Sequence, residues 1–112
     1  MAESISRALP LFMTDDFFRQ TGGYAASCGT RADYEEREVQ SFDPPMESAR
    51  QAAERVFHIF QNIDENHMTP DAGRSMMVGD CVELTDSNGT KTLLRCESFG
   101  FARDEFQETT HA

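Results

Sequence analysis

The alternation of hydrophobic and polar residues changes along the chain, and each pattern predicts a different element. The stretch 8–13 is mostly apolar and contains Pro10, which has no backbone N–H group. It therefore predicts an edge strand or an extended entry to the fold. Residues 14–23 predict a short helix, because Thr14 can cap its N-terminus and Gly22 can end it.

The strongest helical pattern covers residues 44–63. Asp43 is a favourable N-cap, and Pro44 suits the first helical position, where its missing N–H removes no helical hydrogen bond. Apolar residues then recur at steps of three and four, which predicts one buried stripe made of Met46, Ala49, Ala53, Val56, Phe57, Phe60 and Ile63. Residues 36–42, just before this helix, favour a strand with one solvated face, although their charges also suit a helix.

Two runs rich in β-branched and aliphatic residues, 78–85 and 90–96, flank Asn88-Gly89. Asn-Gly is the strongest short signal for a β-hairpin, because both residues accept positive φ angles. A two-residue turn at this site predicts the cross-strand pairs Asp86–Lys91, Leu84–Leu93, Val82–Arg95 and Cys81–Cys96. The face of this hairpin that carries Val82, Leu84 and Leu93 is then expected to pack against the 44–63 helix.

Together these elements predict one α+β domain over residues 1–112. We expect a small antiparallel sheet built on the C-terminal hairpin, packed against one long amphipathic helix and a short N-terminal helix. Gly79-Asp80 predicts a bend at the entry to the hairpin, where Gly permits unusual dihedral angles and Asp binds nearby backbone. The ends, about 1–7 and 104–112, are expected to be flexible.

The charge of the chain limits its partners. Twenty acidic residues against ten basic ones give a formal net charge of −10. A phosphate surface repels such a chain, so we expect no direct binding to nucleic acid or to anionic lipid. The candidate partner-binding residues are the densest acidic group, Asp33, Glu35, Glu36 and Glu38, together with Arg74, whose side chain could bind a carboxylate or phosphate. The expected partner is a protein with a basic surface, while the simpler alternative is that the charge serves solubility alone.

The three cysteines, Cys28, Cys81 and Cys96, form no CxxC pair. Their odd number, and the lack of an N-terminal apolar run of signal-peptide length, predict a reducing cytoplasm, in which thiols are more common than disulfides. No apolar stretch reaches the ~20 residues that span a bilayer. The residues Asp64, Glu65 and His67 do not have the ligand spacing of a zinc or calcium site, so no metal and no cofactor is expected.

One segment resembles a known family. The run Arg74-Ser75-Met76-Met77-Val78-Gly79-Asp80-Cys81-Val82-Glu83-Leu84, followed by Cys96-Glu97-Ser98-Phe99-Gly100-Phe101, is similar to the YodL-like domain. The similarity covers about residues 74–101, and the chain departs from the family pattern at Met76-Met77 and at Cys96-Glu97. The resemblance implies an accessory protein of a conjugative element or a phage, and it implies no established activity.

Three hypotheses of function follow. The first is a small acidic, non-enzymatic binding protein of a phage or plasmid, which inhibits a host defence complex such as CRISPR–Cas or a restriction enzyme by occupying a basic surface. The second is an accessory domain for the maintenance or transfer of a conjugative element, without mimicry of DNA. The third is a small enzyme that uses some of Ser75, Asp80, His58 and Cys28, although these residues match no recognised catalytic motif.

Overall fold

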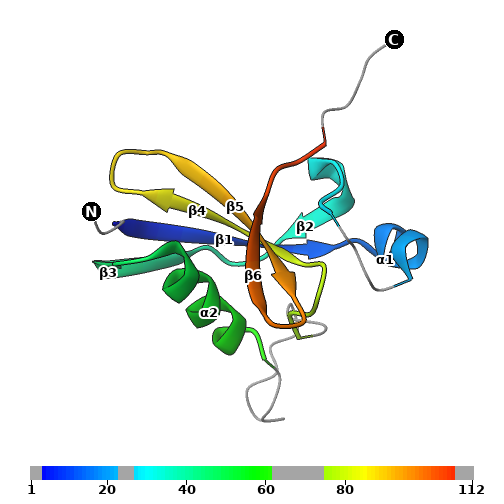
Figure 1. Ribbon diagram of the computed structural model, residues 1–112, viewed down its shortest axis with the longest axis horizontal. Coiled ribbons are helices and arrows are strands. Elements are labelled where there is room, and N and C mark those ends of the chain that lie inside the picture. Colours follow the sequence, from blue (N-terminus) through cyan, green and yellow to red (C-terminus); the bar gives the residue numbers. More distant parts are fainter. Residues whose placement is uncertain (1–3, 23–26, 62–74, 108–112) are drawn as a thin grey trace.

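The computed structural model describes residues 4–22, 27–61 and 75–107, which form an antiparallel sheet with helices packed on it (Figure 1). In chain order the elements are β1 (Ile5–Met13), α1 (Asp15–Thr21), the 3-10 turn η1 (Arg31–Asp33), β2 (Tyr34–Glu36), β3 (Gln40–Met46), α2 (Ala49–Ile59), β4 (Cys81–Asp86), β5 (Lys91–Glu97) and β6 (Gly100–Asp104). Within the described residues the sheet has six strands, in the order β2-β1-β4-β5-β6, and β3 also pairs with β1. The predicted α+β class with an antiparallel sheet is therefore confirmed.

The first strand lies inside the sheet, so the prediction of an edge strand is wrong. β1 pairs with β4 along one side and with β2 and β3 along the other. Pro10 is tolerated there because it lies opposite the break between β2 and β3, where its carbonyl accepts a hydrogen bond from the N–H of Arg37 at 2.9 Å. The N–H and C=O of one strand residue point to the same side, so the missing donor faces this break and not β4. Ile5 to Arg7, expected in a flexible end, are also paired in this strand.

The short N-terminal helix is confirmed as α1. Thr14 is its N-cap, and the side-chain oxygen of Thr14 accepts a hydrogen bond from the N–H of Phe17 at 3.2 Å. Gly22 ends the helix with a φ angle of 67°, in the left-handed region that glycine adopts easily. The strand predicted over 36–42 is instead two strands, β2 and β3, which follow each other along one side of β1.

The long helix begins later than predicted. α2 starts at Ala49, and the side chain of its N-cap, Ser48, accepts a hydrogen bond from the N–H of Gln51 at 3.1 Å. Asp43 and Pro44 belong to β3. The physical reason is the second proline, Pro45, because a residue that precedes proline is disfavoured in the helical region.

The buried face of α2 is made of small residues. Its buried side chains are Ala49, Ala52, Ala53 and Val56. Three alanines let the helix approach the sheet closely, and Ala52 belongs to this face although the predicted stripe omits it. Phe57 and Phe60 are partly buried beside the core. Ile63, the last residue of the predicted stripe, lies outside the described residues.

The hairpin between β4 and β5 forms with a register one residue away from the predicted one. Leu84 faces Thr92, Thr85 faces Lys91 and Cys81 faces Arg95. The four predicted pairs, Asp86–Lys91, Leu84–Leu93, Val82–Arg95 and Cys81–Cys96, are therefore wrong.

The cause of the shift is the loop at the tip of this hairpin. Gly89 has a φ angle of 85°, whereas no non-glycine residue in the described chain has a positive φ angle, so Asn88 does not form the predicted two-residue turn. The Asp86 side chain accepts hydrogen bonds from the N–H groups of Asn88 and Thr90, both at 2.9 Å, and stabilises a three-residue loop. A slip of one residue moves Leu93 to the opposite face of the sheet from Leu84.

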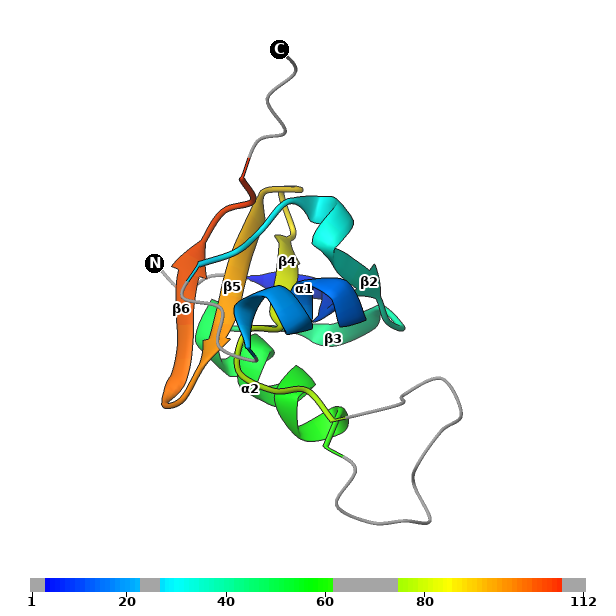
Figure 2. The same ribbon diagram turned by 90° about the vertical axis from the view of Figure 1, so that its right-hand side faces the viewer.

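Both faces of the sheet are covered, as Figures 1 and 2 show from two sides. The cluster under α2 consists of Ile5, Ala8, Phe12, Ala49, Ala52, Ala53, Val56, Met76, Val82, Leu84 and Leu94. The cluster on the opposite face consists of Leu11, Met13, Cys28, Tyr34, Cys81 and Leu93, with side chains of α1 and of the C-terminal segment packed around it. Val82 and Leu84 therefore face α2 as predicted, whereas Leu93 does not.

Candidate interaction surface

The predicted acidic residues do not act as one free patch. Asp33 ends the turn η1, and its Oδ2 accepts hydrogen bonds from the backbone N–H of Thr30 at 2.8 Å and from the Thr30 hydroxyl at 3.2 Å. This carboxylate therefore holds the local turn in place. Glu35 and Glu36 are exposed on β2, as predicted, but each is paired with an arginine.

Two arginines neutralise the acidic residues of β2. Arg31 lies 3.3 Å from Glu36 and 3.0 Å from Glu83, and the hydrogen bond with Glu83 is the main cause of the raised pKa of Arg31. Arg37 lies 3.3 Å from Glu35, and its guanidinium stands 4.8 Å from the centre of the Phe12 ring. Cation–π contacts and ion pairs of this kind keep arginine side chains in fixed positions. The net negative charge at β2 is consequently small.

Uncompensated negative charge lies along β3 and its flanks, and also at Asp15, Asp16, Glu54 and Glu105 elsewhere on the described surface. Glu38, Asp43 and Glu47 are exposed, and none of them has an ion-pair partner among the residues that the structure describes. We call these three residues the β3 carboxylates. Of the predicted acidic group, only Glu38 belongs to this set, and the sequence pattern gave no reason to include Asp43 and Glu47.

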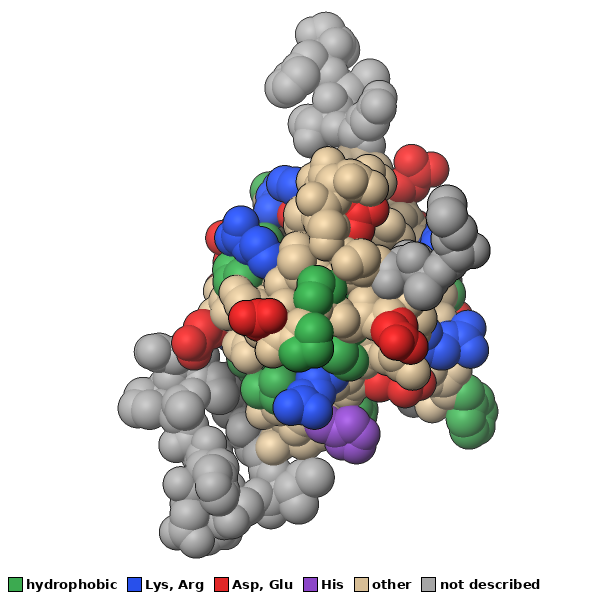
Figure 3. Space-filling model, turned by 90° about the vertical axis from the view of Figure 1, so that its left-hand side faces the viewer, with side chains coloured by type: hydrophobic (Ala, Val, Ile, Leu, Met, Phe, Trp, Pro, Cys, Tyr) green, Lys and Arg blue, Asp and Glu red, His purple; other side chains and the backbone are tan. Residues whose placement is uncertain are grey.

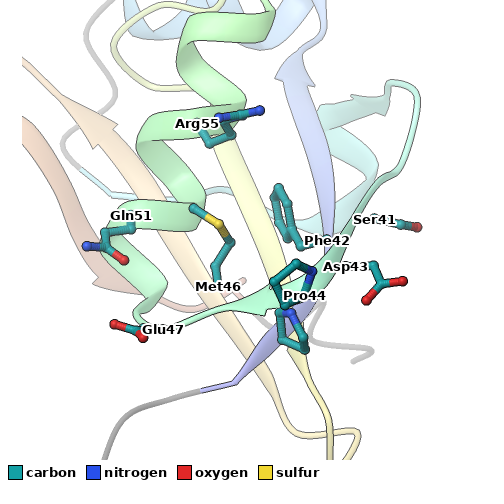
Figure 4. A pocket seen from close by; sticks show the side chains of 9 residues that line it. Ser41, Phe42, Asp43, Pro44, Met46, Glu47, Gln51 and Arg55 are labelled. Atoms are coloured by element: carbon teal, nitrogen blue, oxygen red, sulfur yellow. The ribbon is translucent and has the colours of Figure 1, made fainter.

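A groove of about 370 Å³ lies between β3 and α2, beside two of the β3 carboxylates (Figure 4). Its lining is made of Ser41, Phe42, Asp43, Pro44, Pro45, Met46, Glu47, Gln51 and Arg55. In Figure 4 the side chains of Phe42 and Met46 point towards α2, while Arg55 stands on the helix above them. The groove thus combines a partly apolar floor with charged groups at its rim.

The surface around this groove carries both signs of charge. Figure 3 shows the side of the molecule on which the start of β1 lies, with acidic side chains scattered among basic and hydrophobic ones. The acidic side chains on this side are therefore dispersed among the others.

A second, more apolar groove lies at the other end of α2. It has a volume of about 290 Å³, and Phe57, His58 and Phe101 are among its lining residues. Next to it, Phe99 in the turn between β5 and β6 is 98% exposed.

The candidate catalytic residues are engaged in structural contacts or lie apart. Asp80 is fully buried, and its two carboxylate oxygens accept hydrogen bonds from the backbone N–H groups of Met13 and Met77, both at 2.9 Å. Cys28 lies in the cluster on the sheet face opposite α2, whereas His58 is exposed on α2 itself. The sulfur of Cys28 is therefore separated from the His58 ring by the sheet.

The remaining predictions concern Arg74, the loop at residues 64–67, metal binding and membrane crossing. Arg74 and the loop with Asp64, Glu65 and His67 lie outside the described residues. In the part of the chain that is described, no three His, Cys, Asp or Glu side chains come together as metal ligands. No described helix is long and apolar enough to cross a membrane.

Comparisons of the chain with protein-family models, with curated proteins and with solved structures gave no match. The resemblance of residues 74–101 to the YodL-like domain therefore stays a prediction.

Proposed function

We propose that this protein is a non-enzymatic binding protein of a phage or plasmid, which occupies a basic surface on a protein partner. In its concrete form, the partner is a host complex that handles nucleic acid in defence, such as a CRISPR–Cas effector or a restriction enzyme. The resemblance to the YodL-like domain supports the setting in a mobile genetic element.

The observation that carries this proposal is the set of β3 carboxylates. Glu38, Asp43 and Glu47 are exposed and lack ion-pair partners within the described chain, whereas Glu35 and Glu36 on β2 are neutralised by arginines. Charges left without partners in the free protein are available to basic groups of another protein. The adjacent groove offers Phe42 and Met46 as apolar contacts for the same partner.

The expected strength of this contact follows from the exposure of the three carboxylates. A solvent-exposed ion pair contributes about 0.2–1 kcal/mol, so three such pairs contribute roughly 0.6–3 kcal/mol, and the middle of this range is about a tenfold change in affinity. Their larger effect is on association, because complementary charges accelerate encounter and do so less at high salt. Binding should therefore weaken steeply as the ionic strength rises.

The test is a DNA-cleavage assay with a panel of purified CRISPR–Cas effectors and restriction enzymes, at low and at physiological salt. We expect the protein to inhibit at least one of them, with an inhibition constant that rises with salt. The variant Glu38→Gln/Asp43→Asn/Glu47→Gln should inhibit about tenfold more weakly. The control Asp15→Asn/Asp16→Asn/Glu105→Gln removes the same number of exposed charges elsewhere and should inhibit normally. Absence of inhibition at low salt across the panel, or an equal loss in both variants, contradicts the proposal.

A second candidate is favoured by the exposure of Phe99. An accessory domain that binds a partner without mimicking DNA would use an apolar surface, and Phe99 with the neighbouring groove at Phe57 and Phe101 offers one. Binding to a protein of the same mobile element, lost in Phe99→Ser and kept in the β3 carboxylate variant, would identify this function instead.

A further inference from the structure

Two of the three cysteines are in contact inside the protein. The sulfur atoms of Cys28 and Cys81 are 3.1 Å apart, and the two residues are 1% and 0% exposed. This distance is shorter than two sulfur atoms in ordinary van der Waals contact, which lie roughly 3.6 Å apart. The pairing differs from the predicted one, because Cys81 faces Arg95 across the hairpin and Cys96 faces Phe101.

The backbone around Cys28 is held by three hydrogen bonds from separate elements. The N–H of Cys28 donates to the carboxylate of Asp104 on β6 at 3.1 Å, and Asp104 is in turn paired with Arg95. The N–H of Gly29 donates to the Tyr34 hydroxyl at 3.1 Å, and the carbonyl of Gly29 accepts from the N–H of Gln107 at 2.9 Å. Cys28 is therefore fixed relative to the sheet.

Cys81 is fixed by the sheet itself. It is the first residue of β4 and pairs with Leu11 of β1 on one side and with Arg95 of β5 on the other. The two thiols thus belong to parts of the chain that are distant in sequence and are both held by hydrogen-bonded backbone. Their contact is a feature of the fold and not of a single loose loop.

We propose that Cys28 and Cys81 form an oxidation site, in which hydrogen peroxide converts the two thiols into an intramolecular disulfide. An S–S bond is about 2.05 Å long, so the two sulfur atoms need to approach by only about 1 Å. The proposal does not depend on the proposed function.

The reaction balances with one molecule of peroxide. The Cys28 thiolate attacks one peroxide oxygen, the O–O bond breaks, and the hydroxide that leaves takes up the proton that Cys28 has lost, which gives a sulfenic acid and water. The sulfur of Cys81 then attacks the Cys28 sulfur, the S–O bond breaks, and the leaving hydroxide takes the Cys81 proton to form a second water. Two electrons pass from the two thiols to the peroxide.

The surroundings favour Cys28 as the residue that reacts first. The pKa of Cys28 is lowered, mainly by the hydrogen bond between its sulfur and that of Cys81, and the Tyr34 hydroxyl adds a smaller effect of the same sign. The pKa of Cys81 is raised, mainly by that same hydrogen bond and by burial. A lower pKa increases the thiolate fraction, which is the reactive form.

Cys96 is excluded from this site by its position. Its neighbour across the strands is Phe101, and it lines the groove beside Phe57 on the α2 side of the sheet. Burial and the carboxylate of Asp80 raise the pKa of Cys96 to about 11, so its thiolate is scarce at neutral pH. Cys96 is therefore an internal control in the same molecule.

The disulfide would close a covalent loop from Cys28 to Cys81. This loop contains β2, β3 and α2, so oxidation ties the edge of the sheet and its covering helix to β4. A cross-link that constrains the unfolded chain raises the midpoint of unfolding.

The test uses the full-length protein, reduced and then exposed to hydrogen peroxide in native buffer. After removal of peroxide, the protein is denatured, its free thiols are alkylated and its peptides are mapped by mass spectrometry. We expect one alkylated cysteine, Cys96, together with a Cys28–Cys81 linked peptide and a higher urea midpoint that dithiothreitol reverses. Oxidation in 8 M urea (about the concentration that unfolds small domains) serves as a control and should give mixed pairings.

Two variants test which cysteines form the disulfide. Cys96→Ala should oxidise like the wild type, whereas Cys81→Ala should form no intramolecular disulfide and show no rise in the urea midpoint. Three alkylated cysteines in the peroxide-treated native wild type, or a native disulfide that includes Cys96, would overturn the proposal. Both of these readings come from the wild-type protein, so they stand even when a variant fails to fold.

Discussion

Asp80, which precedes β4, and Asp86, the last residue of β4, allow a test of what burial adds to a hydrogen bond. Asp80 and Asp86 each accept bonds from two backbone N–H groups, and all four bonds are 2.9 Å long. Asp80 is 0% exposed, whereas Asp86 is partly exposed at the tip of the hairpin. Replacing each by alanine removes similar bonds from two different environments.

The expected magnitudes differ because water can replace only one of the two carboxylates. A hydrogen bond to a charged group contributes about 1.5–3 kcal/mol, and a buried donor left without a partner costs about 1–3 kcal/mol. Asp80→Ala leaves the N–H groups of Met13 and Met77 without this acceptor, so we expect a loss of about 3–5 kcal/mol in the free energy of unfolding. At Asp86→Ala water reaches the freed N–H groups, and the expected loss is about 1 kcal/mol.

Urea unfolding followed by far-ultraviolet circular dichroism measures both values, since the chain has no tryptophan. A loss of 3–5 kcal/mol is a large part of the ~5–15 kcal/mol that stabilises a small domain. Asp80→Asn therefore serves as a milder variant, because its amide oxygen still accepts one bond while its NH₂ group faces the second N–H. We expect it to lose roughly half as much. Losses for Asp80→Ala and Asp86→Ala that agree within about 0.5 kcal/mol would refute the reasoning.

Two further predictions concern the start of α2 and the end of β6. Ser48→Ala removes the side chain that accepts a hydrogen bond from the N–H of Gln51, and it should lower the free energy of unfolding by about 1 kcal/mol. Asp43→Ala should change the free energy of unfolding by less than about 0.5 kcal/mol, because Asp43 does not cap the helix. Equal losses for the two variants in urea unfolding would contradict a helix that begins at Ala49. Burial raises the pKa of Asp104, but hydrogen bonds from two backbone N–H groups and the charge of Arg95 lower it to a net value below 3.8. The stability that this carboxylate provides is therefore present above pH 3.8 and is lost as the pH falls through its folded pKa. In unfolding experiments, wild type and Asp104→Asn should differ at about pH 6, and the difference should shrink as the pH is lowered below 3.8.

Local signals in the sequence were sufficient for elements whose contacts are local. The cap at Thr14 and the stop at Gly22 act within a few residues, and the predicted short helix forms between them. The bend at Gly79-Asp80 was also predictable, and Gly79 has a φ angle of 97°. Each of these features depends on backbone geometry that its own residues determine.

The predictions were wrong where two local backbone conformations are close in energy, or where contacts with a segment distant in sequence determine the structure. Asn88-Gly89 permits a two-residue turn, but the Asp86 side chain stabilises the three-residue loop and shifts every pair in the hairpin. Pro10 predicts an edge strand unless the partner strand is interrupted opposite to it, as happens between β2 and β3.

The candidate site was less predictable than the fold. Glu35 and Glu36 of the acidic run are exposed on β2, but the sequence does not show that Arg31 and Arg37 lie close enough to neutralise them. The contact of Cys28 with Cys81 depends on the position of the segment before η1, to which no local pattern points. Such pairs arise from tertiary structure alone.

The position of β1 inside the sheet has a consequence for how the chain folds. β1 is an early segment, yet its longest partner is β4, with Ala8 opposite Leu84, so the sheet cannot close until most of the described chain is available. Until then the side of β1 that faces β4 lacks its final neighbour, although β2 and β3 on its other side come earlier in the chain. Sheets whose strands pair over long sequence separations fold slowly, on the scale of milliseconds to seconds. Before the strands pair, their exposed apolar residues are prone to aggregation. During synthesis, we therefore expect the apolar residues of β1 to stay exposed at this side until β4 has been made.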